Sequence, residues 1–242
     1  MTLLTRRPDD AGRAALALYR SSPAAVRAHV TIRWWSAPFA SIAAALPRTG
    51  RILEIGCGHG LFSAYAALDA PGREVVGVDI DTAKIAQGHA AARDVDHLEL
   101  RVAESGAVPP GPWDAVVFVD VLYLLPASEQ QRLLTEAVAQ LAPEGMVLVK
   151  EMGVAPRWKV RWNTWQETIS VKVLRITEGS SFDFVAPETM AGWLSELGLK
   201  VSQRRLDHGR VHPHHLVVAR REARLVPGAT PDPPSYPGAS GE

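Results

Sequence analysis

Three glycines at alternate positions follow an apolar run in the stretch ILEIGCGHG, residues 52–60. The run has the composition of a buried strand, and the apolar residues 61–68 that follow have the composition of a helix. At such a turn Gly56 can adopt a positive φ, Gly58 lets a ligand reach the backbone, and Gly60 lets the helix pack on the strand. The stretch therefore predicts a ligand-binding turn between a strand and a helix.

Strand-like and helix-like segments alternate from this turn as far as residue 152. This alternation is typical of crossover units and predicts a parallel sheet covered by helices on both faces. Ser128 and Gln131 have the spacing of a capping box, so a helix is expected to begin at Ser128 and to stop before the turn Pro143-Glu144-Gly145. Strands are expected over residues 51–55, 74–80, 97–102, 113–120 and 146–152, with helices over 61–68, 82–93 and 128–141.

The segments on either side of this alternating region have other patterns. Residues 1–48 are expected to form a helical N-terminal cap, with apolar helical patterns over 11–19 and 24–46 and an interruption at Pro38. The main domain is expected over 49–222 and to end in a helix and a final strand pair.

Two further segments are expected to differ from the main domain. Trp158, Trp162 and Trp165 recur at helical spacing, which predicts an inserted helical lid over 154–178. Residues 223–242 are rich in proline and glycine and contain few aliphatic side chains, so they are expected to be a disordered tail.

The spacing of the glycines indicates which class of nucleotide ligand the turn would bind. The fingerprint of NAD-binding folds is G-x-G-x-x-G, whereas here the third glycine comes one residue earlier and Leu61 stands in its place. An NAD-linked oxidoreductase is therefore disfavoured. The turn is one residue shorter than that fingerprint, and Glu54 lies two residues before Gly56. Both features fit a ligand without a pyrophosphate.

Five motifs in order resemble those of the class I S-adenosylmethionine-dependent methyltransferases. E-x-G-x-G-x-G resembles the first motif, EVVGVDID the second, RVAES the third, WDAVVFVD the fourth, and the helix, turn and strand up to residue 152 the fifth. In the third motif Glu104 stands where the family usually has aspartate. The resemblance implies that the cofactor is bound by Glu54, Gly56, Cys57, Gly58, Gly60, Asp79, Ile80, Glu104, Ser105 and Asp120, with Asp79 holding the ribose hydroxyls.

The resemblance also implies a fold and an activity. The fold would be a doubly wound, Rossmann-like α/β fold with a seven-stranded, mostly parallel sheet, an antiparallel final strand and the helical N-terminal cap. The activity would be methyl transfer from S-adenosylmethionine, giving S-adenosylhomocysteine, to a small or lipid-like organic acceptor, with oxygen slightly favoured as the methylated atom. A non-catalytic binding or regulatory subunit of the same fold is the alternative, and an acceptor-sized pocket would favour the enzyme.

Methyl transfer from a sulfonium needs alignment and exclusion of water, and a base only when the acceptor is a weak nucleophile. Tyr123 is a candidate to face the acceptor and His214 a candidate base, although a packing tyrosine and a histidine in a turn are the alternatives. Arg33 is a candidate partner of the cofactor carboxylate. No metal is expected, because the histidines near His214 have no carboxylate or cysteine at ligand spacing. Cys57 is expected to be a small loop residue without a redox role.

Composition limits the partners. The chain has 26 basic and 26 acidic residues, so nothing in its charge favours nucleic acid. A single cysteine, no apolar leader and no run of about 20 apolar residues lead us to expect a cytoplasmic protein without a transmembrane segment. The abundance of Ala, Arg and Pro is typical of a GC-rich, bacterial genome. The oligomeric state is left open.

Aromatic residues suggest what the acceptor is like. Five of the seven tryptophans lie in the N-terminal segment and in the predicted lid, which hints at a large apolar or aromatic acceptor. Packing of the two segments on each other is the alternative. Basic residues of the predicted lid allow a peripheral contact with a membrane, and a solvated basic face is the alternative.

Overall fold

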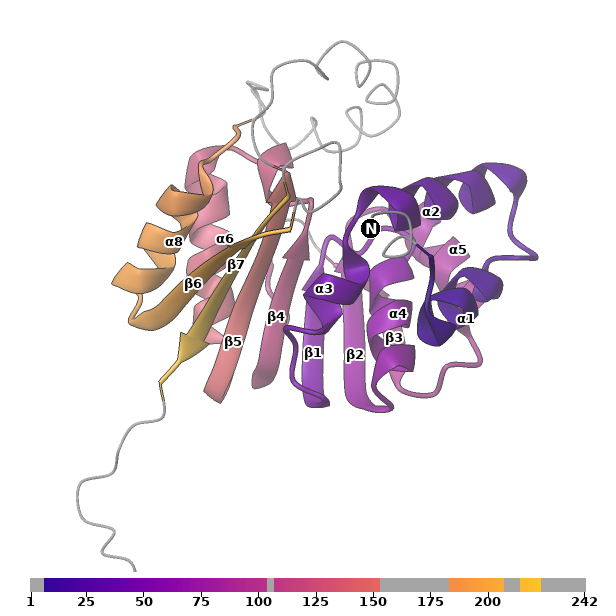
Figure 1. Ribbon diagram of the computed structural model, residues 1–242, viewed down its shortest axis with the longest axis horizontal. Helices are drawn as coiled ribbons and strands as arrows, with labels where there is room; N and C mark the ends of the chain where they lie inside the picture. Colours follow the sequence, from indigo (N-terminus) through magenta and orange to yellow (C-terminus); the bar gives the residue numbers. More distant parts are fainter. Residues whose placement is uncertain (1–6, 104–106, 153–182, 207–213, 223–242) are drawn as a thin grey trace, which may run out of the picture.

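Among the described residues, seven strands form one sheet in the order β3-β2-β1-β4-β5-β7-β6 (Figure 1). The computed structural model describes residues 7–103, 107–152, 183–206 and 214–222. Strands β1 to β5 run parallel, and β7 is antiparallel to both β5 and β6, which confirms the expected fold class. The strands are β1 (Thr49–Ile55), β2 (Gly72–Asp79), β3 (Leu98–Val102), β4 (Trp113–Val119), β5 (Leu141–Met152), β6 (Leu199–Arg205) and β7 (His214–Arg221).

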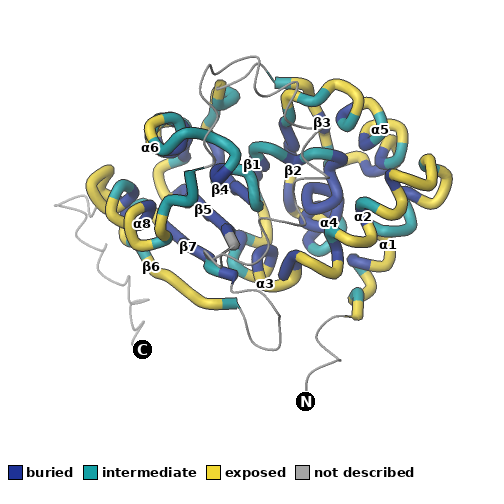
Figure 2. The backbone as a smooth tube through the Cα atoms, turned by 90° about the horizontal axis from the view of Figure 1, so that it is seen from above, coloured by how far each residue is buried: buried dark blue, intermediate teal, exposed yellow. Residues whose placement is uncertain are grey.

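Helices cover both faces of this sheet. On one face the apolar side chains of α1 to α4 pack against the strands, and on the other face those of α6 and α8 do so. Figure 2 shows the buried strands between these two layers, with the outer sides of the helices exposed. The helices are α1 (Asp10–Leu18), α2 (Ala24–Ser36), α3 (Phe39–Ala43), α4 (Leu61–Asp69), α5 (Thr82–Ala92), η2 (Leu122–Leu124), α6 (Ala127–Ala139) and α8 (Pro187–Glu196).

The order of the strands reverses at β1, which lies between β2 and β4. Ile55, the last residue of β1, is paired with Val78 on one side and with Phe118 on the other. In open parallel sheets a ligand binds beyond the carboxyl ends of the strands at such a switch point. The glycine turn that follows β1 lies at this position.

The N-terminal helices pack on α4 through aromatic side chains. The ring of Trp34 lies edge-on to those of Phe39 and Tyr65, at centroid distances of 5.7 and 5.1 Å. Tyr65 Oη donates a hydrogen bond to Asp9 Oδ2 at 2.9 Å. Trp34 is thus a packing residue of the cap. The lid expected over 154–178 and the tail expected over 223–242 lie outside the described residues.

The start of α6 differs from the expectation. The helix begins at Ala127, and its N-cap is Pro126, with no side-chain hydrogen bond, so the capping box predicted at Ser128 is wrong. Pro126 has φ −56°, and its carbonyl accepts hydrogen bonds from the N–H groups of Glu129 and Gln130. The proline already has helical φ, so the helix starts before the serine.

Pro143-Glu144-Gly145, predicted as a turn, lie within the bounds of β5 but interrupt its pairing with β4. A Cβ on Gly145 would lie 3.0 Å from the backbone N and O of Ala142, so the chain folds back on itself at this point. Leu141 pairs with Trp113 at one end of this stretch, and Met146 pairs with Ala115 at the other. The register shifts between the two pairs, so the extra residues are accommodated as an irregularity of the strand. None of the described helices is both long enough and apolar enough to cross a bilayer.

Candidate functional site

The three glycines of the turn all have positive φ, at 78° for Gly56, 58° for Gly58 and 76° for Gly60. A Cβ on Gly56 would lie 2.3 Å from Val121 Cγ2, and one on Gly60 would lie 2.6 Å from Leu100 Cδ1. Both positions therefore need glycine for packing. A Cβ on Gly58 would meet no atom within 4 Å. Open space above the backbone at Gly58 is what a bound ligand requires.

Asp79, the last residue of β2, is fixed beside this open space. Its Oδ2 accepts a hydrogen bond from the N–H of Gly58 at 2.7 Å, and its Oδ1 accepts one from the N–H of Asp81 at 2.8 Å. The side chain is half-buried, and each oxygen keeps a second acceptor position. The carboxylate is therefore oriented by the backbone and can still accept from the hydroxyls of a sugar.

Two apolar side chains are exposed at the same edge of the sheet. Ile80 follows β2 and is 37% exposed, and Val102 ends β3 and is 49% exposed. Neighbouring exposed apolar side chains of this size fit a flat heterocycle. The predicted adenine contacts Glu104 and Ser105 lie outside the described residues.

Cys57 points away from the open space. Its side chain packs with Ile85 and Leu100, and its N–H donates to Val78 O at 3.0 Å. Burial raises the pKa of the thiol well above its ordinary value, so it is not a nucleophile. Only the backbone of Cys57 is placed to meet a ligand.

Glu54 lies at the carboxyl end of β1 and is buried, and Ser63 donates a hydrogen bond to its Oε2. Burial raises the pKa of Glu54 to about 7, and the nearby carboxylate of Asp79 adds to the rise. The hydrogen bond from Ser63 and the charge of Arg33 act in the opposite direction. Glu54 is therefore a buried carboxyl group whose charge changes near neutral pH.

Asp120 follows β4 and adopts the left-handed conformation, with φ 54°. Its two oxygens accept from Lys150 Nζ at 2.5 and 2.6 Å, and Oδ2 also accepts from Arg33 Nη1 at 3.0 Å. Burial would raise the pKa of Asp120, but the two cations hold it below its ordinary value. Burial lowers the pKa of Lys150. One carboxylate thus contacts two cations, and this cluster has a net positive charge when all three groups are ionised.

Both catalytic candidates lie at the same edge as Asp120. Tyr123 is in the short helix η2 after β4, is 5% exposed, and stacks on Phe184 with centroids 5.4 Å apart. Burial raises the pKa of Tyr123, so its hydroxyl stays protonated. His214 is buried at the start of β7, opposite Met152 of β5.

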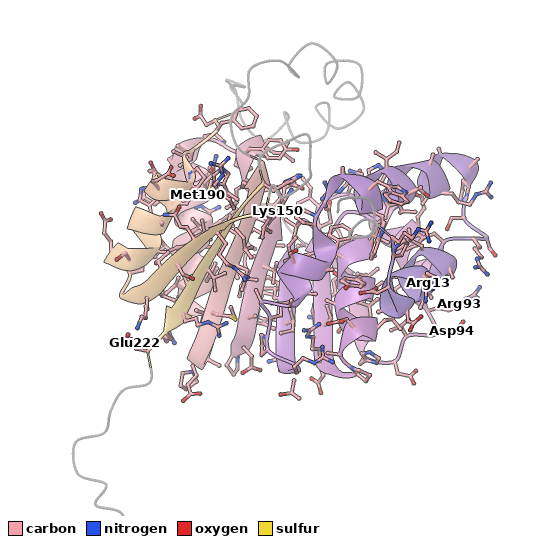
Figure 3. All side chains as sticks on the ribbon, in the orientation of Figure 1. Arg13, Arg93, Asp94, Lys150, Met190 and Glu222 are labelled. Atoms are coloured by element: carbon pink, nitrogen blue, oxygen red, sulfur yellow. The ribbon has the colours of Figure 1, made fainter. Side chains whose placement is uncertain are left out.

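Sequence reasoning missed two charged residues of the site. Lys150 has no exposed side-chain surface and pairs with Asp120 (Figure 3 labels it near the carboxyl end of β5). Glu151 is buried, and its Oε1 accepts from the N–H of Leu122 at 3.0 Å. The signal was present in the sequence, since MVLVKEM places two adjacent charges in an apolar strand.

The N-terminal cap braces the glycine turn. Tyr19 Oη donates to the carbonyl of His59 at 2.6 Å, and the rings of His29 and His59 lie 4.7 Å apart. Within the described ranges, no three His, Cys, Asp or Glu side chains come together as a metal site. The open space at Gly58, beside the fixed carboxylate of Asp79, can bind a nucleoside.

Comparison with known proteins gives a family match over most of the chain. The family model described as "Methyltransferase domain" matches residues 27–204. Among curated relatives, the ubiquinone biosynthesis O-methyltransferase of Xanthomonas campestris pv. campestris (strain B100) is 25% identical over 188 residues, covering 70% of this chain and 76% of that protein. The enzyme of the same name from Xylella fastidiosa (strain 9a5c) is 26% identical over 159 residues, covering 64% and 63%.

Solved structures share the fold at low identity. An O-methyltransferase family protein from Burkholderia thailandensis has a TM-score of 0.58 and 16% identity, covering 77% of this chain and 56% of that one. An O-methyltransferase family 2 protein from Planctomyces limnophilus, solved with apigenin, has a TM-score of 0.58 and 19% identity, covering 88% and 67%. Phosphoethanolamine N-methyltransferase 2 from Haemonchus contortus, solved with S-adenosyl-L-methionine, has a TM-score of 0.57 and 15% identity, covering 77% and 54%. The chain thus spans little more than half the length of two of these structures.

Proposed function

Because this chain belongs to the methyltransferase-domain family and is an S-adenosylmethionine-dependent methyltransferase, we propose that it methylates an oxygen atom of a small organic acceptor. The names of its curated relatives support oxygen as the methylated atom. The observation that carries the proposal is the glycine turn, where open space above Gly58 lies beside the fixed carboxylate of Asp79.

The residues present fit the cofactor. We propose that Asp79 accepts from the ribose hydroxyls, that Ile80 and Val102 contact the adenine, and that the turn at Gly58 lies against the nucleoside. When bound, S-adenosylmethionine supplies a methyl group on a sulfonium, which leaves readily. Arg33 is the proposed partner of the amino-acid carboxylate, since Arg33 and Lys150 share the single carboxylate of Asp120 and the three groups together carry one net positive charge when ionised.

The acceptor is proposed to be an aromatic alcohol, that is, a phenol. The stacked rings of Tyr123 and Phe184 offer an aromatic wall beside the carboxyl end of β4. The hydroxyl of Tyr123, protonated at neutral pH, can donate a hydrogen bond to the acceptor oxygen. His214 is one candidate to take the proton from a phenol, which is a weak nucleophile until it loses that proton.

We also propose a cellular compartment for the enzyme. The single cysteine supports a cytoplasmic setting, and the bacterial sources of the curated relatives support a bacterial enzyme. A lipid-like phenol would bring the enzyme into peripheral contact with a membrane.

Calorimetry and a methyl-transfer assay test this function. The purified chain should bind S-adenosylhomocysteine and not NAD, and it should transfer labelled methyl groups to phenols in preference to amines. A preference for NAD would overturn the cofactor assignment. Binding of S-adenosylhomocysteine without transfer to any phenol, amine or thiol would instead favour a non-catalytic binding subunit.

A further inference from the structure

Glu151 is a buried carboxyl group in which one oxygen accepts a hydrogen bond and the other has no hydrogen-bond donor among the described residues. It lies at the carboxyl end of β5 and is 7% exposed. Its Oε1 accepts from the N–H of Leu122 at 3.0 Å, which fixes the side chain against η2. Among the residues that the structure describes, no group donates a hydrogen bond to Oε2. A buried acceptor atom without a donor lowers the stability of the folded state, so we expect this oxygen to bind either a ligand or a proton.

The surroundings of Glu151 raise the pKa of its carboxyl group. Burial, assisted by the charge of Asp120, raises the pKa of Glu151 to about 8, while Lys150 and the backbone N–H groups of Leu122 and Val121 act in the opposite direction. The titratable neighbours are Asp120 and Tyr123 after β4, Lys150 on β5 itself, and His215, which is opposite Glu151 on β7. A base works best when its pKa lies near the working pH.

The aromatic wall next to Glu151 is held in place from α6. Phe184 stacks on Tyr123 with an angle of 5° between the rings. The preceding residue, Asp183, accepts from the N–H of Ala127 at 3.2 Å through its Oδ2, and from Gln130 Nε2 at 2.7 Å through its carbonyl. Leu122, which Glu151 holds, is next to Tyr123 in the chain. The short helix η2 thus contacts the carboxyl group of Glu151 through Leu122 and carries Tyr123, one of the two stacked rings.

We propose that Glu151 is a catalytic residue, the proton acceptor for the hydroxyl of a phenolic acceptor. The proposal rests on the proposed function. The O–H bond of the phenol breaks and its proton goes to Oε2 of Glu151, while the oxygen electron pair forms the new bond to the methyl carbon. The carbon–sulfur bond breaks with its electron pair staying on sulfur. Because burial favours the neutral carboxyl, accepting the proton relieves the charge of Glu151.

Glu151→Gln tests this role, because glutamine keeps the shape and the acceptor for Leu122 but cannot take a proton. The matched control is Glu144→Gln, which changes an exposed carboxylate at the start of the same strand. The probes are 4-methylcatechol, whose hydroxyls are protonated at neutral pH, and 4-nitrocatechol, whose acidic hydroxyl ionises without help. Glu151→Asp checks for partial rescue.

The two probes should respond differently. Glu151→Gln is expected to lower kcat/KM for 4-methylcatechol by about 100-fold or more, and for 4-nitrocatechol by less than about tenfold. Affinity for S-adenosylhomocysteine, measured by calorimetry, should stay within twofold of the wild type, as in the control. Equal losses on both catechols, or no loss on either, would overturn the role of Glu151. If the wild type methylates neither catechol nor any other phenol, the proposed function itself fails.

A second measurement needs no turnover. Infrared spectra of the ligand-free protein, recorded as a function of pH, should show a protonated carboxyl component that disappears near pH 8 in the wild type and is missing in Glu151→Gln. The component from Glu54, which is lost near pH 7, should be present in both proteins. A Glu151 that remains protonated up to pH 10 could not accept a proton, and this result would refute the proposal even without an acceptor in hand.

Discussion

Lys150 and Asp120 form a buried ion pair, with the ammonium 2.5 and 2.6 Å from the two carboxylate oxygens. Their side chains are 0% and 3% exposed. Lys150→Met removes the buried ammonium and leaves Asp120 with Arg33 as its remaining cation, so the variant should lower the free energy of unfolding by about 1.5 to 3 kcal/mol in urea titrations. Lys200→Met, which removes an exposed lysine, should change it by less than about 0.5 kcal/mol.

Removing both charges of this pair should recover part of that loss. The double variant Asp120→Asn, Lys150→Met removes both charges of the pair, and asparagine tolerates the left-handed conformation that Asp120 adopts. Arg33 loses its carboxylate partner in this variant, but its side chain is 30% exposed and stays partly hydrated. Its stability should lie above that of Lys150→Met alone. A double variant that is less stable than the single variant would show that Arg33 alone compensates Asp120.

Gly58 and Gly198 form a matched pair for testing the ligand space. Both have positive φ, and a Cβ would meet no atom within 4 Å of either. Each alanine variant should therefore fold with a similar cost, about 1 to 2 kcal/mol. Only Gly58→Ala should weaken binding of S-adenosylhomocysteine, by tenfold or more in calorimetry. Equal affinities in both variants would contradict a nucleoside contact at Gly58.

Asp79→Ala should reduce the affinity for S-adenosylhomocysteine by at least tenfold, because hydrogen bonds to a charged group contribute about 1.5 to 3 kcal/mol. Asp94→Ala is the control: this exposed carboxylate lies at the edge of the molecule, far from Lys150 (Figure 3). Circular dichroism should confirm that both variants fold. Unchanged binding in Asp79→Ala would remove the ribose contact from the site.

Glu54 should make the ligand-free protein less stable as the pH rises. Its pKa is about 7 in the folded protein and about 4.5 when unfolded, so between these values the folded state binds the proton more tightly. Stability from this group is therefore lost as the pH rises through 7, by about 2 to 3 kcal/mol between pH 5 and 8. Glu54→Gln should lose correspondingly less stability over that range. Parallel curves for variant and wild type, from urea unfolding at several pH values, would contradict the raised pKa.

The sheet and the glycine turn could be predicted because their signals are local. The glycines at 56, 58 and 60 each have a conformational or packing reason, and the strands around them alternate with helices at crossover spacing. The start of α6 was predicted wrongly because two local signals competed. Pro126 gives the helix an earlier start than the hydroxyl of Ser128 would.

The charged cluster could be predicted only in part. Arg33 and Asp120 are 87 residues apart, and nothing in the chain pattern shows that the cap brings them together. Lys150 and Glu151 are adjacent but point to opposite faces of the sheet, so one pairs with Asp120 while the other holds η2. Such roles depend on the tertiary arrangement.

The hydroxyl of Tyr19 holds the carbonyl of His59, and His59 belongs to the glycine turn. Displacing α1 and α2 therefore breaks the hydrogen bond that holds the glycine turn, and a change in the conformation of the turn removes the acceptor that holds these helices. By thermodynamic reciprocity, a nucleoside that steadies the turn must also slow the opening of these N-terminal helices. Amide protons of α1 and α2 should consequently exchange more slowly with deuterium once S-adenosylhomocysteine is added.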